Sequence, residues 1–292
     1  MATFSTLGTA GQFGNLNPTI ISNQIQLVAF TNLPYPKLIN WQSQNGAGSV
    51  LKVGQATYTT AMAAVTDDGS DSSSAAYTTT LRTITQTAKG LDFLLTLMAN
   101  EFQISDQSHV VDTLSKSYMK KVDTDIMALY TEAGSGSNRI GAAGTPLTFA
   151  NGFVPAFTQL AAGSAPAPYA WILAAPQIAE IGTESQFAEW QKLGKAWLDE
   201  SINLPTGYLG VAPWGVECCY SNNYTVSSGN CGMMFAKQGL RLLEHKPFEV
   251  AIDASEIGVA SRTIKFGGTT IYGVAGVRDT STTNKFVVAV VS

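Results

Sequence analysis

Apolar side chains recur at helical spacing between residues 105 and 132. Intervals of four, four, four, four and three residues separate the members of this stripe, which are Val110, Leu114, Tyr118, Val122, Ile126 and Leu129. A repeat near 3.6 residues predicts one long amphipathic helix whose core is formed by these side chains. Ser105 or Asp106 can cap its start, and Gly134 ends it. At 1.5 Å per residue this helix is about 40 Å long, well beyond the typical globular helix.

A Thr-rich projection is predicted for residues 46–88. Residues 50–53 begin a strand, and residues 77–87 return as a second strand rich in threonine, which favours β structure. Residues 67–74 form a polar tip between them. The aspartates of this tip lack the later bidentate Glu of a calcium-binding EF-hand, so we expect no metal there.

The middle of the chain, residues 137 to about 235, alternates helical and strand patterns. Residues 170–174 form a short apolar run that predicts a buried strand, and residues 176–193 follow as a helix opened by proline. Residues 216–220 predict another strand. Residues 207–214 contain glycine and proline and predict a loop before it. This order indicates a compact α/β unit.

The segment from residue 233 onward has the pattern of β structure. Residues 248–252 and residues 285–291 predict two strands. Between them, Gly267 and Gly268 separate two short β-type runs, and we expect a hairpin with these glycines as its two-residue turn.

The first 45 residues contain one charged side chain, Lys37, yet apolar residues such as Ile20, Leu27 and Phe30 recur among them. A disordered tail would be more charged and less apolar. We therefore expect an extended arm that lies on another surface. The start of the chain lacks a basic and apolar signal segment, and no apolar run approaches the roughly 18 residues of a membrane span, so neither export nor membrane insertion is expected.

The chain is poor in charge. Charged residues make up 13% of it and hydrophobic residues 45%, whereas an ordinary soluble domain has roughly 25% charged residues. Such a surface is expected to be buried against neighbours in an oligomer. The net charge of −4 argues against a dedicated nucleic-acid binder, which needs a basic face, but not against a protein that encloses DNA.

Residues suited to catalysis or metal binding are few. His109 and His245 are the only histidines, and no Gly-x-Ser-x-Gly nucleophile elbow accompanies them. Cys218, Cys219 and Cys231 lack a Cys-x-x-Cys or His-x-x-His companion, so we interpret them as small buried hydrophobic residues. We expect no catalytic centre, no metal and no cofactor.

Four stretches carry a resemblance to a known family. They are the projection at 48–88, the helix Asp112–Tyr130 with its Asp-Thr-Asp-Ile-Met-Ala-Leu phrase, the strand Tyr169–Pro176 with the helix after it, and Gly210–Asn222. In this order they resemble the E-loop, spine helix, A-domain strand and following loop of the tailed-bacteriophage major capsid proteins, which have the Hong Kong 97-like fold. The resemblance covers residues 15 to 292 and rests on the order of elements.

The resemblance implies an α+β fold with an N-terminal arm, an extended β E-loop, a long spine helix, a P-domain β-sheet and an α/β A-domain. Its implied boundaries are an arm at 1–45, an E-loop at 46–88, a P-domain segment with the spine helix at 89–136, an A-domain at 137–235 and a return to the P-domain sheet at 236–292. Inter-subunit contacts are expected at the charged loop residues Lys52, Asp67, Asp68, Asp71 and Arg82.

The function implied by the resemblance is structural. Family members form icosahedral shells of hexamers and pentamers around double-stranded DNA, without sequence-specific binding, together with a portal protein and separate scaffolding or cement proteins. Assembly in the host cytoplasm and residence in the virion follow from this. Two alternatives stay open: an encapsulin nanocompartment shell, which has the same fold, and a secreted surface-layer protein or adhesin, suggested by the Thr, Ser and Gly content.

Overall fold

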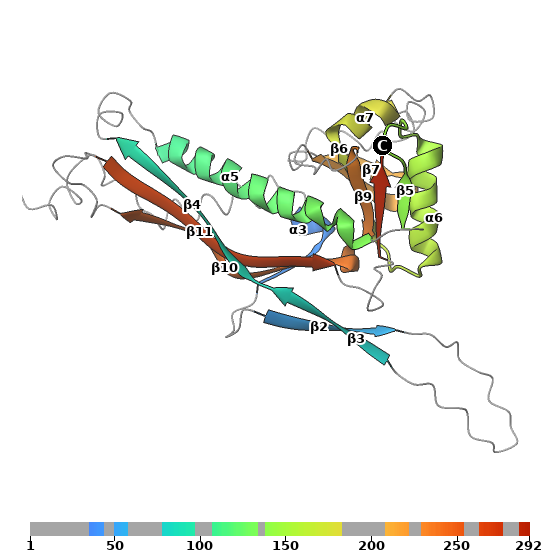
Figure 1. The fold of residues 1–292 in the computed structure, drawn as a ribbon, viewed down its shortest axis with the longest axis horizontal. Coiled ribbons are helices and arrows are strands. Elements are labelled where there is room, and N and C mark those ends of the chain that lie inside the picture. The colour runs from blue at the N-terminus through green and yellow to red at the C-terminus, as the bar shows by residue number, and fades with distance from the viewer. Residues whose placement is uncertain are drawn as a thin grey trace, which may run out of the picture.

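Two β-sheets joined by one long helix form the described part of the molecule (Figure 1). The structure is a computed structural model of the 292-residue chain. It describes residues 35–43, 50–57, 78–96, 107–133, 138–182, 208–221, 229–253, 263–276 and 286–292. The expected arm at 1–45 therefore lies outside the described residues except for residues 35–43, which include the short helix α3 (Tyr35–Leu38).

The larger sheet has six strands. Their spatial order is β5 (Arg139–Gly141), β12 (Val287–Val291), β9 (Cys231–Ala236), β6 (Tyr169–Ala174), β8 (Val216–Ser221) and β7 (Tyr208–Ala212). The β12–β5 and β6–β8 pairs are parallel, and the other three pairs are antiparallel. The short helices beside these strands are η2 (Phe149–Phe153), α6 (Val154–Ala162), α7 (Ala175–Gly182), η4 (Pro213–Gly215) and η5 (Lys237–Gly239).

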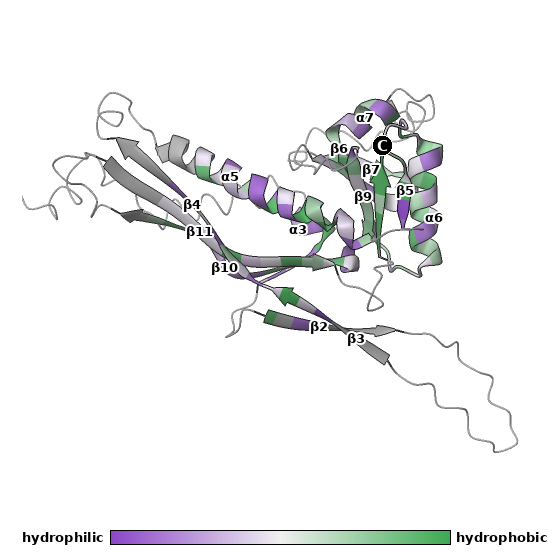
Figure 2. Cartoon of the chain, viewed as in Figure 1, coloured by the Kyte–Doolittle hydropathy of each residue, from purple (hydrophilic) through white to green (hydrophobic). Residues whose placement is uncertain are grey.

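Both faces of this sheet are covered, and successive side chains point into different cores. Trp171 packs with Phe153 and Leu160 on the face covered by η2 and α6, whereas the next residue, Ile172, packs with Ile126 on the face covered by the long helix. The same alternation applies to the other central strands. Side chains of a strand point to opposite faces, so a strand buried on both sides must be apolar throughout, as β9 and β12 are (Figure 2).

The smaller sheet has four strands and is long. Its order is β1 (Asn40–Ser43), β10 (Leu240–Asp253), β11 (Thr263–Gly276) and β4 (Thr87–Thr96), with β1 parallel to β10 and the other pairs antiparallel. The long helix α5 (Gln107–Met127) runs along one face of this sheet and reaches the six-stranded sheet with its C-terminal end (Figure 1).

The predicted long helix is confirmed, with 21 residues in α5 followed by the 3-10 segment η1 (Ala128–Ala133). Leu114, Tyr118, Val122 and Ile126 are buried in one core, and Leu129 packs partly buried against it. Val110 lies on α5, but its side chain is outside the described residues. The stripe therefore joins α5 to both sheets, because Tyr118 contacts Phe248 of β10, 5.1 Å between ring centroids.

A separate two-stranded hairpin projects from this body. β2 (Val50–Thr57) pairs antiparallel with β3 (Thr78–Thr85), from Val50 opposite Thr85 to Thr57 opposite Thr78. Figure 1 shows that the end of the hairpin where β2 finishes and β3 begins is directed away from α5. The two strands predicted within residues 46–88 are thus present, while the tip at 67–74 lies outside the described residues.

The predicted hairpin turn at Gly267 and Gly268 is wrong. β11 runs straight through both residues, which pair with β4 and with β10. A Cβ atom on Gly268 would fall 2.2 Å from Cζ of Phe248, so this position has no room for a side chain. Glycine inside a strand often marks such a close approach rather than a turn.

The predicted loop at residues 207–214 is also wrong for most of its length. Residues 208–212 form β7, the edge strand next to β8. Gly210 has a φ of 116° beside a register shift in the β7–β8 pairing. Its glycine therefore marks a bulge in an edge strand, and Pro213 comes only after the strand has ended.

The assignment of all of residues 236–292 to the P-domain sheet is wrong for the last strand. β10 and β11 do pair with β4, but β12 lies between β9 and β5 in the six-stranded sheet. All five residues of β12 are buried. This continuous apolar run is typical of a strand covered on both faces, as the strands at the centre of the six-stranded sheet are. The predicted helix at 176–193 begins as α7, and residues 183–193 lie outside the described residues.

Candidate assembly surfaces

The root of the β2–β3 hairpin is fixed to the body by few contacts. Ile84 of β3 is buried against Leu243 and Ala275, the three residues of a small separate cluster. The Arg82 guanidinium forms an ion pair with Glu132 of η1, 2.5 Å between Nη2 and Oε1. Between β3 and β4, Gln86 is buried and its Nε2 has no hydrogen-bond partner among the described residues. These contacts lie in the half of β3 that leads into β4.

The sequence-predicted contact residues fall into two groups. Lys52 is exposed on β2, with Thr83 opposite it. Arg82 is half-buried, with 30% of its side chain exposed, and already has an intrachain partner in Glu132. Asp67, Asp68 and Asp71 lie outside the described residues. An inter-subunit role for these five residues stays a prediction.

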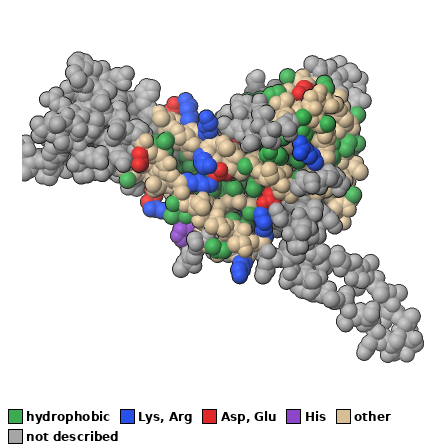
Figure 3. All heavy atoms as spheres, viewed as in Figure 1, with side chains coloured by type: hydrophobic (Ala, Val, Ile, Leu, Met, Phe, Trp, Pro, Cys, Tyr) green, Lys and Arg blue, Asp and Glu red, His purple; other side chains and the backbone are tan. Residues whose placement is uncertain are grey.

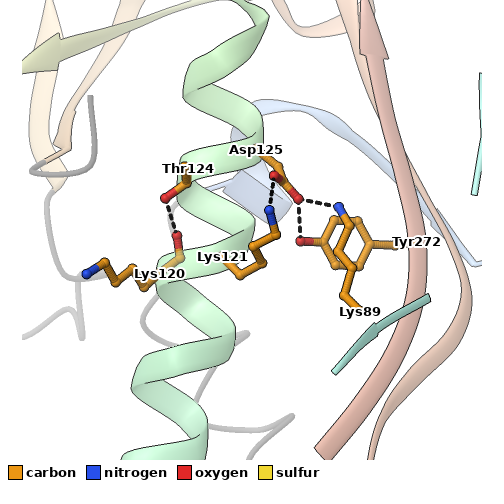
Figure 4. A network of polar contacts seen from close by, with 6 residues as sticks. All are labelled: Lys89, Lys120, Lys121, Thr124, Asp125 and Tyr272. Carbon is orange, nitrogen blue, oxygen red and sulfur yellow. Dashed lines mark hydrogen bonds and ion pairs between the residues drawn. The ribbon is translucent and has the colours of Figure 1, made fainter. Parts of the chain in front are cut away.

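A charged network holds α5 to the four-stranded sheet (Figure 4). Asp125 accepts hydrogen bonds from Lys89 of β4, from Lys121 one helical turn before it and from Tyr272 of β11, the last at 2.8 Å. Burial of Asp125 raises the pKa of its carboxyl group, but the three hydrogen bonds outweigh this and leave the pKa below its usual value. The Lys89 ammonium also lies 3.8 Å from the centre of the Tyr272 ring.

A second carboxylate joins three segments that are distant in the sequence. Asp123 is buried and accepts hydrogen bonds from Tyr35 of α3 and from Ser221 at the end of β8, the latter at 2.6 Å. Burial, followed by the charge of Asp123, raises the pKa of Tyr35 well above its usual value, so this hydroxyl stays a donor. Asp123 therefore ties α3, α5 and the six-stranded sheet together.

Glu244 of β10 is a buried carboxylate with weaker support. Trp41 Nε1 and Tyr118 Oη donate to it, each at 3.4 Å. Burial raises the pKa of Glu244 more than these two hydrogen bonds lower it. Unlike Asp125, this residue forms no ion pair with any Lys, Arg or His in the described part of the chain that would offset the loss of water.

An exposed aromatic side chain marks the edge of the six-stranded sheet. Trp214 is 60% exposed, has a φ of 64° and stacks on Phe153 and Phe157, at 5.5 and 4.6 Å between ring centroids. Sequence reasoning missed it. The Pro-Trp-Gly turn was visible, but nothing in the sequence showed that the indole would face outward.

Clustered metal ligands and reactive thiols are features expected of many enzymes. Among the described residues, no three His, Cys, Asp or Glu side chains come together as metal ligands. The cysteines are free and buried, which confirms their interpretation as hydrophobic residues. Burial raises the pKa of the Cys218 and Cys219 thiols, and they face opposite sides of the sheet. In the part of the chain that the structure describes, no helix has the length and apolarity to cross a membrane.

Comparison with known proteins identifies the fold. No family model and no curated protein sequence matches the chain. Solved structures do match, all at low identity. The capsid of Ralstonia phage GP4 aligns with a TM-score of 0.69 and 10% identity over 87% of this chain and 86% of that one. The acid-stable capsid of Helicobacter pylori bacteriophage KHP30 aligns at 0.64 and 14%, over 89% and 91%.

A structure from Mycobacterium phage Che8 aligns as well, with a TM-score of 0.60 and 15% identity over 88% of this chain and 90% of that chain. The protein therefore has the fold of the phage capsid proteins. This is the Hong Kong 97-like α+β fold that the order of elements in the sequence resembles, and the prediction of fold class is confirmed.

Proposed function

We propose that this chain is the major capsid protein of a tailed bacteriophage, which assembles into an icosahedral shell around double-stranded DNA. The observation that carries the proposal is the capsid fold with its projecting β2–β3 hairpin. An isolated two-stranded hairpin is at best marginally stable in water, and its free strand edges invite pairing. A neighbouring copy of the chain supplies the missing cover.

The proposal includes the partners that such a shell needs. Copies of the chain form hexamers and pentamers, a portal protein occupies one vertex, and separate scaffolding or cement proteins assist assembly. The protein assembles in the bacterial cytoplasm and ends in the virion. Its role is structural, so it needs neither a catalytic centre nor a cofactor, and it holds DNA without reading its sequence.

Electron microscopy of the purified chain, alone and with candidate scaffolding protein, tests this role. We expect closed shells or capsomers, and virion-derived shells should protect double-stranded DNA from nuclease. Shells loaded with an enzyme instead of DNA would identify the encapsulin alternative. A chain that stays monomeric at every concentration, with scaffolding protein present, contradicts the proposal.

The contribution of the projection can be tested separately. Replacing residues 62–76 with a short Gly-Ser turn should leave a folded subunit with a similar circular dichroism spectrum, because the polar residues 67–74 within it are unsuited to packing a core. It should impair shell formation or lower the temperature at which shells dissociate. Shells as stable as the parent would show that the projection is dispensable.

The proposed contact at Arg82 needs a control for its intrachain ion pair. Arg82→Ala removes both that pair and any contact with a neighbour, whereas Glu132→Gln removes the pair alone. If Arg82 acts between subunits, Arg82→Ala should weaken assembly more than Glu132→Gln does. Equal effects of the two substitutions would assign Arg82 to its own subunit. Lys52→Ala, on the exposed side of β2, tests the neighbouring position.

A further inference from the structure

The helix α5 is neutral in sequence but not on its surface. It contains three lysines and three aspartates, and the fold separates the two kinds. Asp123 is buried, and only 16% of the Asp125 side chain is exposed. By contrast, 69% of the Lys116 side chain and 52% of the Lys121 side chain are exposed. The outward side of α5 therefore carries excess positive charge.

One further lysine, from β4, extends this surface. We call Lys89, Lys116, Lys120 and Lys121 the α5 lysine strip. Two carboxylates lie among them: Asp125, shared by Lys89 and Lys121, and Asp112, 2.6 Å from the Lys116 ammonium. Lys120 is exposed and forms no ion pair within the described part of the chain. Four cations and two anions leave a local charge of +2 on a chain whose net charge is −4.

Three lysines of the strip, Lys116, Lys120 and Lys121, are exposed along the outward side of α5, whereas the Lys89 side chain is 19% exposed. Figure 3 shows Lys and Arg side chains gathered there, and Figure 4 shows Lys120 directed away from the sheet and from Asp125. A groove of about 350 Å³ begins beside it, between α5 and the sheet, with Lys89 and Lys121 among its lining residues. A large anion can therefore approach the lysines without any movement of the backbone.

The chemistry of the strip favours a phosphate backbone over a protein partner. Protein interfaces centre on large apolar or aromatic anchors. Among the described residues, the exposed large apolar side chains are Val50, Leu91, Val211 and Trp214. None of them is on α5, and Leu91 of β4 alone among them lines the groove beside the strip. Contacts to phosphates need only cations and hydroxyl donors, and Thr113 is exposed one turn from Lys116.

We propose that the α5 lysine strip contacts the phosphate backbone of double-stranded DNA, so that the α5 side of the four-stranded sheet faces the packaged genome. The choice of DNA as the polyanion rests on the proposed function. A charge of +2 gives weak binding by one subunit, and the binding is independent of base sequence because only phosphates are touched. Many copies in a shell add such weak contacts, and each one still releases quickly.

The test compares matched double variants of the purified full chain. Binding to a random-sequence duplex is measured by fluorescence anisotropy at salt concentrations from about 20 to about 200 mM. Relative to the parent, Lys116→Gln with Lys120→Gln should make the slope of log K against log salt shallower by about 2. Lys237→Gln with Lys246→Gln removes the same charge elsewhere and should leave the slope unchanged.

A gain-of-binding variant guards against loss through misfolding. Asp112→Asn removes the exposed carboxylate next to Lys116 and should tighten DNA binding by about two- to threefold. The proposal is overturned if the strip variant keeps the parental slope, if the control variant loses as much, or if the parent shows no binding at the lowest salt. Preference for polyglutamate over duplex of equal charge would overturn it in favour of an acidic protein.

These outcomes are independent of shell formation, which electron microscopy of the same samples reports. If the protein forms shells but the salt slope of its DNA binding does not depend on the α5 lysine strip, this inference fails and the proposed function stands. A strip-dependent slope in a chain that never forms shells would do the reverse.

Discussion

The two sheets of this molecule are stabilised by different means. The six-stranded sheet is covered on both faces, and its central strands are buried and apolar throughout. The four-stranded sheet has α5 on one face, and this contact combines an apolar core with ionisable groups, chiefly Asp125 and Glu244. Packing volume therefore governs the first sheet, whereas the attachment of α5 to the second also depends on a few charged contacts and, through them, on the pH.

Ile126→Asp disrupts the core that α5 forms with both sheets, and it should have the largest effect on the free energy of unfolding. Ile126 is fully buried in the core that α5 forms with both sheets. An unpaired carboxylate there should lower the free energy of unfolding by several kcal/mol, and we expect insoluble protein. Ile126→Leu, which conserves volume, should cost about 1 kcal/mol. Soluble, folded Ile126→Asp in a chemical denaturation assay would show that the stripe faces solvent.

Asp125→Asn tests the charged attachment alone. It leaves Lys89 and Lys121 without their shared carboxylate and should cost about 2 kcal/mol of unfolding free energy at pH 7. The folded pKa of Asp125 is lowered, so its stabilisation is complete above the unfolded pKa, near 3.9, and is lost as the pH falls through the folded value.

Urea denaturation of both proteins across the acid range checks this prediction. The difference between the parent and Asp125→Asn should shrink below about pH 4. Asp112→Asn breaks an exposed pair on the same helix and should change stability by no more than about 0.5 kcal/mol. A difference that is constant with pH would mean that Asp125 acts through packing rather than through its charge.

Glu244→Gln should change the stability least of these three substitutions, and it should stabilise the protein where the other two destabilise it. The folded pKa of Glu244 is raised, so its contribution favours folding below the unfolded carboxyl pKa and is lost as the pH rises through the folded value. Glutamine can still accept from Trp41 and Tyr118. The variant should gain on the order of 1 kcal/mol at pH 8 and little at pH 4.

Thermal melts at the two pH values measure this gain, with Glu249→Gln, an exposed carboxylate on the same strand, as the control. Loss of stability at pH 8 would show that the charged form of Glu244 is favoured in place, and the four-stranded sheet would then resist alkaline conditions better than we expect.

The same contrast explains what the sequence could and could not predict. The α5 stripe and the apolar strands were readable because burial on one or both faces imposes a period on the residues themselves. Gly268 and Gly210 led to wrong predictions of a turn and a loop, because glycine permits both turns and close approaches of the backbone. The contact with Phe248 decides the case of Gly268, and the bulge beside Tyr208 decides that of Gly210.

The charged contacts were harder to predict because they join distant segments. Lys89 and Asp125 are 36 residues apart, and Tyr35 and Asp123 are 88 apart. No local pattern links such residues. The sorting of acids from bases on α5 depends in the same way on what surrounds the helix. Arg82 could be singled out as a charged residue of the projection, but its partner Glu132 could not.

The position of β12 between β9 and β5 has a consequence for the timing of folding. β5 ends at residue 141 and is parallel to β12, which ends at residue 291. A ribosome adding ~5–20 residues per second needs roughly 8 to 30 seconds to make the intervening ~150 residues. Throughout that interval β5 lacks its neighbour, and β9, once it has been made, has one free edge until β12 pairs with it. The six-stranded sheet therefore closes only once residue 291 has left the ribosome, long after β5 has been made.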